Sequence, residues 1–164
     1  MHKLDEIDYK ILNILQEDGR VPVAEIARQV KLASPSVHER ISKLQQDGII
    51  KGYTAILDSK KLGLDVTAFI GIKVNPSISS GDSILNELVK IDSILEAHTV
   101  TGEEDILVKV RTENTTSLEK LLKKIYSIKG VQNTRTTVVL STIKETLKIK
   151  ISNKSKKGNN SKSA

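Results

Sequence analysis

The sequence contains no cysteine and no tryptophan, and its aromatic residues are three tyrosines and one phenylalanine. Without cysteine the chain cannot form disulfide bonds, thiolate metal sites or a cysteine nucleophile. So few aromatic rings argue against RNA-binding modules that stack bases on aromatic side chains. Composition alone therefore excludes disulfide scaffolds and cysteine-based metal or catalytic sites, and it disfavours base-stacking RNA modules.

Patterns typical of catalysis and metal binding are equally scarce. The histidines His2, His38 and His98 are far apart, and the chain has no phosphate-binding glycine loop and no grouping of serine, histidine and aspartate. We therefore predict no catalytic residue, no metal ligand and no cofactor. No uncharged apolar run approaches the length of a membrane span, and residues 1–6 do not resemble a signal peptide. These features predict a soluble, cytoplasmic protein without a membrane partner.

The net charge of +6 is concentrated at the C-terminus. Residues 144–164 hold seven lysines and one acidic residue, so the rest of the chain sums to zero. Within the N-terminal part, residues 1–19 are acidic and residues 20–51 are basic, and a local basic surface is what phosphate contact requires. Residues 146–164 are expected to form a basic, disordered tail. It either adds weak, salt-sensitive DNA affinity or only solubilises the chain.

Residues 1–48 carry the periodicity of three short amphipathic helices. The helices are expected at residues 5–17, 23–30 and 34–47. Gly19 is placed to end the first helix in a left-handed conformation, and Ser34 followed by Pro35 is typical of the start of the third. The second and third helices then form a helix–turn–helix, a motif that presents one helix to the major groove of DNA.

The pattern of residues 49–58 predicts a β-strand, the first part of a hinge and linker that extends to residue 65. After three helices, this strand has no partner within its own domain, and an isolated strand leaves its backbone hydrogen bonds unmet. Pairing with the same strand of a second copy would satisfy them and create a two-fold dimer. The alternative is pairing with the sheet of the same chain.

Residues 66–145 alternate strands and helices in the order βαββαβ, which predicts a ferredoxin-like domain. Strands are expected at residues 66–74, 94–100, 105–112 and 131–143, with helices at 82–91 and around 118–125. The predicted fold class is therefore α+β. An N-terminal, winged-helix-like helix–turn–helix domain is followed by a hinge strand and a ferredoxin-like C-terminal domain.

Seven residues are candidates for contact with double-stranded DNA. Ser34, Ser36, His38, Arg40 and Lys43 lie on the third predicted helix, and Arg20 and Arg28 lie outside it. The first turn of that helix offers hydroxyl and amide groups to phosphates or base edges, and Arg40 and Lys43 suit phosphates or guanine edges. The alternative is a module that binds protein or only folds, with these residues forming a solvated face.

A series of short motifs follows one order along the chain. They are LDEIDYKIL at 4–12, EIA at 25–27, SPSV at 34–37, RISKL at 40–44, DGIIKGY at 47–53, VTGEED at 100–105 and GV at 130–131. Together they resemble the Lrp/AsnC (feast/famine) family of transcription regulators over residues 2–145. The resemblance implies a DNA-binding helix–turn–helix and a hinge strand. It also implies a C-terminal domain that dimerises or forms octamers and binds a small effector, often an amino acid.

In similar proteins the loop at residues 101–105 joins the effector pocket between subunits. Glycine permits a sharp turn whose bare amides can receive a carboxylate, while nearby acidic side chains can receive an ammonium group. Many relatives have Gly-Asp-x-Asp here, whereas this chain has Glu103 in place of the first aspartate. The candidate effector-binding residues are Thr101, Gly102, Glu103 and Asp105, with Thr134 and Thr136 on the last strand. The alternative is an ordinary acidic hairpin turn, with the threonines serving only as strand formers.

The leading hypothesis is a sequence-specific DNA-binding regulator modulated by a small metabolite, expected to be an amino acid. Two other functions stay open. Some proteins of similar architecture decarboxylate siroheme, and His98 is the first residue to examine for such an activity. The remaining alternative is a ligand-binding interaction module with a vestigial helix–turn–helix.

Overall fold

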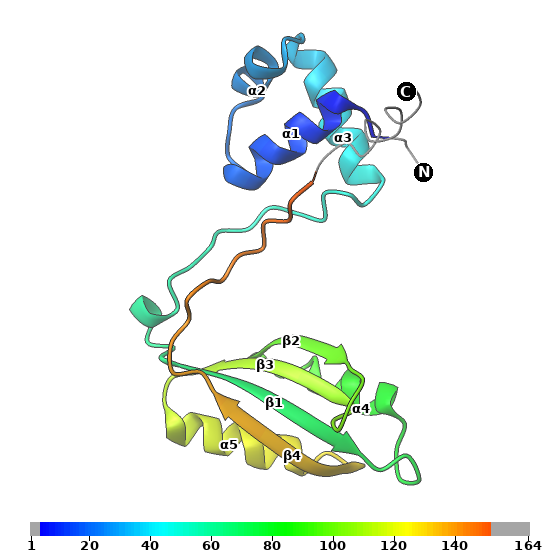
Figure 1. The fold of residues 1–164 in the computed structure, drawn as a ribbon, viewed down its shortest axis with the longest axis vertical. Helices are drawn as coiled ribbons and strands as arrows, with labels where there is room; N and C mark the ends of the chain where they lie inside the picture. Colours follow the sequence, from blue (N-terminus) through cyan, green and yellow to red (C-terminus); the bar gives the residue numbers. More distant parts are fainter. Residues whose placement is uncertain (1–3, 152–164) are drawn as a thin grey trace, which may run out of the picture. The chain divides into compact units, whose positions relative to one another are not determined.

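The computed structural model describes residues 4–151, which divide into two compact units (Figure 1). One contains the chain up to Ile56 together with the chain from Glu145 onward, and the other contains Leu57–Lys144. Each has its own hydrophobic core, so the units are described separately. Within residues 4–151, no helix has the length and apolar character needed to cross a membrane.

The first unit, called here the helical unit, contains α1 (Glu6–Glu17), α2 (Val23–Val30) and α3 (Ser34–Gln46), close to the predicted ranges. Asp5 caps α1: its side chain accepts hydrogen bonds from the N–H groups of Ile7 and Asp8, and the Asp8 carboxylate accepts one from the Asp5 N–H. This capping box satisfies amide groups that the helix itself cannot. Apolar side chains of all three helices form the core: Ile11, Leu12, Ile26, Ala27, Val30, Val37 and Leu44.

The ends of two helices differ from the prediction. Gly19 is not left-handed, because α1 ends with an extended cap residue. A Cβ added to Gly19 would lie 3.1 Å from Cδ1 of Tyr53, so its small size leaves room for the tyrosine ring. The turn between α2 and α3 instead uses a left-handed residue at Lys31, with φ of 58°. The N-cap of α3 is Ala33 rather than Ser34, and no side chain caps this helix.

Residues 49–58 form no β-strand, so the predicted hinge strand is wrong for the single chain. Ile50 packs against the helical core, but Ile56 is 84% exposed. A strand needs a partner for its hydrogen-bond ladder, and the strands described in this chain pair only with one another. The segment is followed by a short 3-10 helix, η1 (Lys60–Leu62).

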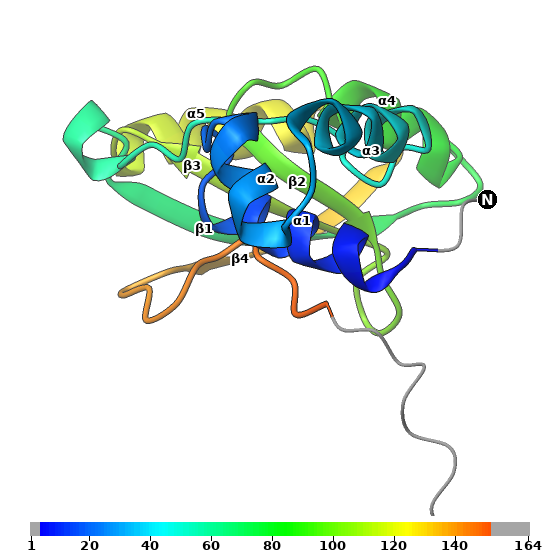
Figure 2. The same ribbon diagram turned by 90° about the horizontal axis from the view of Figure 1, so that it is seen from above.

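The second unit has a four-stranded antiparallel sheet with both helices on one side of it (Figure 2). Its elements are β1 (Val66–Val74), α4 (Gly81–Leu88), β2 (Ile94–Thr99), β3 (Ile106–Thr112), α5 (Thr115–Tyr126) and β4 (Val131–Val138). The strand order β2-β3-β1-β4 is that of the split βαβ fold, which confirms the ferredoxin-like prediction. However, β4 ends at Val138, earlier than the predicted strand end near residue 143.

The two faces of this sheet have different surroundings, because successive side chains of a strand point to opposite sides. The face against α4 and α5 forms the core, with Ala68, Ile70, Ile72, Ile106, Val108 and Val110 buried. The opposite face carries Thr67, Phe69, Lys73, Leu107, Lys109 and Arg111. We call it the open face, because both described helices of this unit lie on the other side (Figure 2).

The chain returns to the helical unit after β4. The sequence predicts a tail over residues 146–164, but the structure groups Glu145 onward with the helical unit. Ile151 packs against the core of that unit, so this part of the predicted tail is docked. The remainder of the tail, residues 152–164, lies outside the described residues.

Candidate nucleic-acid interface and ligand loop

The α3 helix has a buried side and an exposed side. Val37 and Leu44 are buried in the helical core, and Ile41 is half-buried against it. Four of the predicted contact residues on this helix are exposed, namely Ser34, Ser36, His38 and Lys43. Because no side chain caps α3, the N–H groups of its first turn are left for an outside acceptor such as a phosphate. The exposed side can therefore contact nucleic acid without disturbing the core.

The structure gives Arg40 a different role from the predicted one. Its Nη1 lies 2.8 Å from Oδ2 of Asp5 and 2.7 Å from Oδ1 of Asp8, so it joins α3 to the start of α1. The Asp8 side chain is 1% exposed, and a buried carboxylate requires such a partner. Burial raises the pKa of Asp5, but hydrogen bonds from the Asp8 N–H and from Arg40 outweigh it and lower that pKa overall. Arg40 therefore links α3 to the start of α1, and its guanidinium is engaged by two carboxylates.

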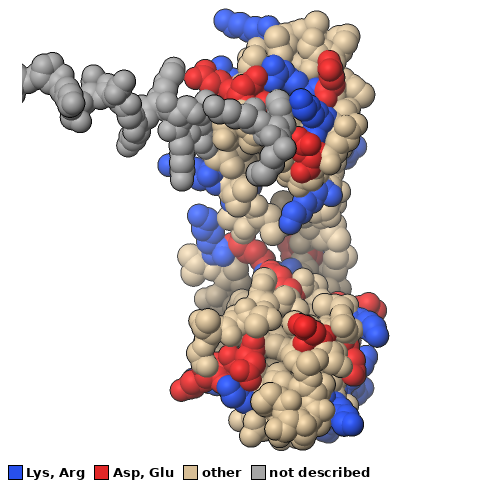
Figure 3. Space-filling view, turned by 90° about the vertical axis from the view of Figure 1, so that its right-hand side faces the viewer, with Lys and Arg blue, Asp and Glu red and all other residues tan. Residues whose placement is uncertain are grey.

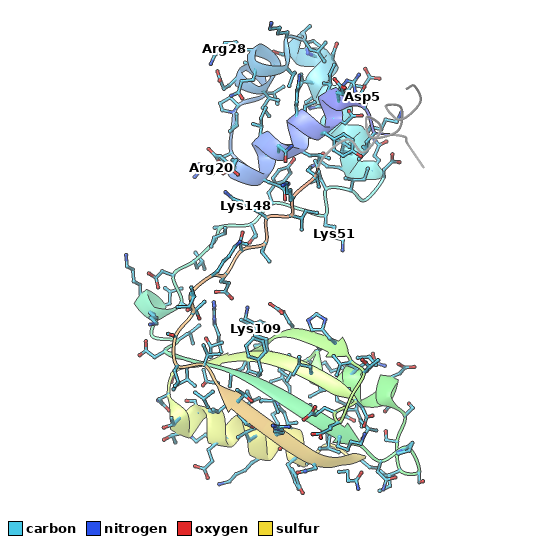
Figure 4. The ribbon with its side chains drawn as sticks, in the orientation of Figure 1. Asp5, Arg20, Arg28, Lys51, Lys109 and Lys148 are labelled. Atoms are coloured by element: carbon cyan, nitrogen blue, oxygen red, sulfur yellow. The ribbon has the colours of Figure 1, made fainter. Side chains whose placement is uncertain are left out.

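Arg28 is also paired, but at the surface. Its Nε and Nη2 donate to the two carboxylate oxygens of Glu25 at 2.9 and 2.7 Å, and these hydrogen bonds, together with one from Gln29, lower the pKa of Glu25 to about 2. The side chain of Arg28 is 76% exposed, so it can exchange this partner for a phosphate. Arg20 is exposed just beyond α1. Figure 4 shows Arg20 and Arg28 at one side of the helical unit and Asp5 at the other.

Basic and acidic side chains alternate over the helical unit in the view of Figure 3, rather than forming one basic surface. Two exposed lysines extend the predicted set. Lys31 lies in the turn between α2 and α3, and Lys51 lies shortly after α3. Neither lysine was among the residues predicted from the sequence, although both flank the third helix and belong to the basic stretch of residues 20–51.

The loop between β2 and β3 is held by Asp105. Its Oδ2 accepts a hydrogen bond from the Val74 N–H at 2.8 Å, and Nζ of Lys73 lies 3.2 Å from its Oδ1. The hydrogen bond from Val74 and the one from Lys73 lower the pKa of Asp105. Gly102 has φ of +124°, a conformation that favours glycine, as the predicted sharp turn requires. Asp105 therefore anchors the loop to the end of β1.

The two glutamates of this loop lie against Arg135 of β4. Nη1 of Arg135 is 3.3 Å from Oε2 of Glu103 and 3.7 Å from Oε1 of Glu104. Glu104 also lies over Gly71, since a Cβ added there would be 2.5 Å from its Cγ. The open face of the sheet thus carries a small group of acidic and basic side chains beside the loop.

The predicted effector residues do not all come together. Thr134 and Thr136 pair with Ile72 and Ile70, whose side chains are buried, so both threonines point toward the helix-covered face. Thr101 is exposed in the loop, as are Gly102 and Glu103. A hollow of about 300 Å³ lies beside Asp105, and its other lining residues are Val74, Pro76, Gly81, Asp82, Thr99 and Ile106. Of the predicted effector residues, only Asp105 lines this hollow, and the lining residues Gly81 and Asp82 of α4 were not predicted.

His98 is exposed on the edge strand β2, with Nε2 3.5 Å from Oε2 of Glu96. This is not the enclosed pocket that a tetrapyrrole substrate requires. Among residues 4–151, no three side chains of metal-ligating type gather into a possible metal site.

A helix–turn–helix joined to a ferredoxin-like domain defines a two-domain DNA-binding regulator. The sequence-family model of the Lrp/AsnC ligand-binding domain matches residues 67–149. The family model of a winged helix–turn–helix DNA-binding domain matches residues 4–51. The chain belongs to the Lrp/AsnC family and is a helix–turn–helix transcriptional regulator.

Relatives agree along almost their whole length. The chain is 45% identical to the HTH-type transcriptional regulator FL11 of Pyrococcus horikoshii, over 90% of this chain and 97% of the relative. The structure of E. coli AsnC superposes with a TM-score of 0.80 at 34% identity, covering 88% of this chain and 97% of that one. The feast or famine regulatory protein of M. tuberculosis, complexed with L-methionine, gives a TM-score of 0.82 at 29% identity, covering 90% and 99%.

Proposed function

We propose that this regulator binds specific duplex DNA sequences through the exposed side of α3. The observation that carries the proposal is the division of α3 into a buried apolar side and an exposed polar side with an uncapped first turn. Ser34, Ser36 and the first-turn amides fit phosphates or base edges, and Lys43 fits a phosphate or a guanine. Arg20, Arg28, Lys31 and Lys51 are assigned to the DNA backbone, and His38 lies beside the first turn.

Gel-shift titration over genomic promoter fragments at two salt concentrations tests this assignment. We expect saturable, site-selective binding that Ser36→Ala and Lys43→Ala each weaken, by about tenfold for a lost base contact. The matched control is Lys120→Ala, an exposed lysine on α5 of the other unit. Equal affinity for all fragments that is lost at the higher salt concentration, and that neither α3 variant changes, would instead favour a ligand-binding interaction module with a vestigial helix–turn–helix.

The loop at residues 101–105, between β2 and β3, is proposed to bind a small amino acid. Support comes from the sharp turn at Gly102 beside the acidic side chains of this loop, and from the L-methionine complex of the M. tuberculosis relative. The ligand can act only through unequal affinity for two assemblies of the protein. Calorimetry against the twenty amino acids identifies it, and a panel without a saturable heat signal would remove this part of the proposal.

A homodimer is proposed as the DNA-binding form. The extended residues 49–58 lack a strand partner in the single chain, and the open face of the sheet carries the half-exposed Phe69. A second copy can cover both and places two α3 helices for successive half-sites. Sedimentation equilibrium distinguishes a monomer, a dimer and an octamer.

A further inference from the structure

The segment at residues 145–151, called here the C-terminal segment, makes a specific contact with the end of α1. Oε1 of Gln16 accepts a hydrogen bond from the Ile149 N–H at 2.8 Å, and Nε2 of Gln16 donates to the Ile149 carbonyl at 3.2 Å. One side-chain amide therefore satisfies both backbone groups of one residue, as a neighbouring strand would.

Two further contacts flank this pair of hydrogen bonds. Nζ of Lys148 lies 2.6 Å from Oε2 of Glu17, next to Gln16 on α1. Ile151 packs against the apolar core of the helical unit. Three neighbouring residues thus hold the segment: Lys148 through an ion pair, Ile149 through backbone hydrogen bonds and Ile151 through apolar packing.

The contact also closes one side of a hollow. A hollow of about 600 Å³ is lined by the end of α1, by residues 52–56 and by Leu147 and Lys148. The Tyr53 ring lies against Gly19 on its wall. The end of α1, the segment that follows α3 and the segment that follows β4 therefore line one hollow.

We propose that the C-terminal segment is a docking peptide that binds the end of α1 in its own chain and gives the DNA-binding unit a second attachment to the ligand-binding unit. The chain crosses between the two units after Ile56 and again after Lys144, so both connections end on the helical unit. A ligand-dependent change at β4 can then reach α1 along the chain to residues 145–151 and through their non-covalent contacts with Gln16 and Glu17, besides the route through residues 49–65. The coupling role rests on the proposed function, but the docking itself does not.

Zero-length carbodiimide cross-linking tests the docking without DNA. Because Nζ of Lys148 and the Glu17 carboxylate are in direct contact, we expect an isopeptide bond between them, identified by peptide mass spectrometry. Gln16→Ala is expected to lower the yield by about fivefold, as for the loss of hydrogen bonds worth about 1 kcal/mol. Asn13→Ala, an exposed change on α1, is the matched control and should leave the yield unchanged, while Lys148→Arg keeps the charge and removes the reactive amine.

Mixing unlabelled and ¹⁵N-labelled protein before the reaction shows which chain supplies each partner. Cross-linked peptides of a single isotope support docking within the chain. Mixed-isotope peptides at the statistical frequency, absence of the 17–148 bond, or equal yields in Gln16→Ala and wild type would each overturn the proposal. None of these outcomes depends on DNA binding, so they leave the proposed function standing.

Truncation separates the coupling role from the charge of the tail. Ending the chain after Ile151 keeps the docked segment, and ending it after Lys144 removes it. With L-methionine or the amino acid found by calorimetry as the probe, we expect the shorter chain to lose most of the ligand-induced change in DNA affinity. The longer truncated chain should keep it. Equal responses of the two would overturn the coupling role, even where the cross-link is present.

Discussion

At the scale of single residues, Arg40 shows how an exposed-looking position can be structural. Its place on α3 suggested a base contact, yet its guanidinium reaches back to Asp5 and Asp8 on α1. The physical reason is Asp8, a capping residue whose carboxylate is almost fully buried. A buried carboxylate without a cation would cost more than a DNA contact gains. One-dimensional periodicity could not reveal this partner, because Asp8 and Arg40 are far apart in sequence.

Arg40→Ala is expected to lower the free energy of unfolding by about 2–3 kcal/mol, because it removes the hydrogen bond and ion pair that Arg40 makes with the buried Asp8 carboxylate. Urea unfolding followed by circular dichroism measures this loss. Lys43→Ala on the same helix is the control and should change stability little, since Lys43 is exposed. A stable Arg40→Ala protein with lost DNA affinity would restore the predicted base contact.

The same ion pair predicts a pH dependence. Since the folded state lowers the pKa of Asp5, the charged carboxylate favours folding. Its contribution is complete above the ordinary value of 3.8 and is lost as the pH falls through the lower, folded-state value. Wild-type unfolding free energies should therefore drop more steeply than those of Arg40→Ala as the pH falls below about 4. Parallel curves would show that other groups control acid unfolding.

Asp105→Ala is expected to weaken amino-acid binding about tenfold, because the loop loses the carboxylate that fixes it to Val74 and Lys73. Asp105→Asn keeps an acceptor for the Val74 N–H but no charge, so the two variants separate loop geometry from electrostatics. Calorimetry with L-methionine and the other amino acids measures both. Glu119→Ala on α5 is the control, and wild-type binding in both Asp105 variants would show that the residue serves only the turn.

At the scale of elements, the sequence predicts what local periodicity and capping determine. The ranges of α1, α2, α3 and β1 agree closely with the structure because their apolar patterns are strong, although the cap residues predicted at Gly19 and Ser34 are wrong. The strand predicted at residues 49–58 is not formed in the single chain, because a strand needs a partner for its hydrogen bonds and the predicted partner is a second copy. Thr134 and Thr136 fail to meet the loop for a related reason. The face to which each side chain points is fixed by the register of β4 against β1.

Residues 49–58 carry the prediction for dimer formation. Ile56 is 84% exposed in the single chain, and burying it against a second copy would stabilise a dimer. Ile56→Asp is therefore expected to raise the dimer dissociation constant about tenfold or more, measured by sedimentation equilibrium. Leu62→Asp in η1 changes a similarly apolar residue, 61% exposed, outside the segment and should have little effect. Equal self-association of both variants would assign the dimer contact to the open face alone.

At the scale of the whole molecule, charge and topology act together. Among the described residues, the N-terminal stretch and residues 145–151 belong to one unit, so the docked segment brings Lys148 to the end of α1. Sequence analysis found the charge but assigned residues 146–164 to a separate tail. It could not find the docking, because the pairing of Gln16 with Ile149 joins positions 133 residues apart.

Ending the chain after Ile151 removes four lysines and no acidic residue. If these lysines contact phosphates, each neutralised phosphate releases a counterion and adds about 0.9 to the slope of log affinity against log salt. We therefore expect the truncated protein to show a slope smaller by up to about 3.5, with its preference among promoter fragments unchanged. Fluorescence anisotropy over a salt series measures both quantities. An unchanged slope would assign the lysines to solubility, because a charge that meets no phosphate releases no counterion.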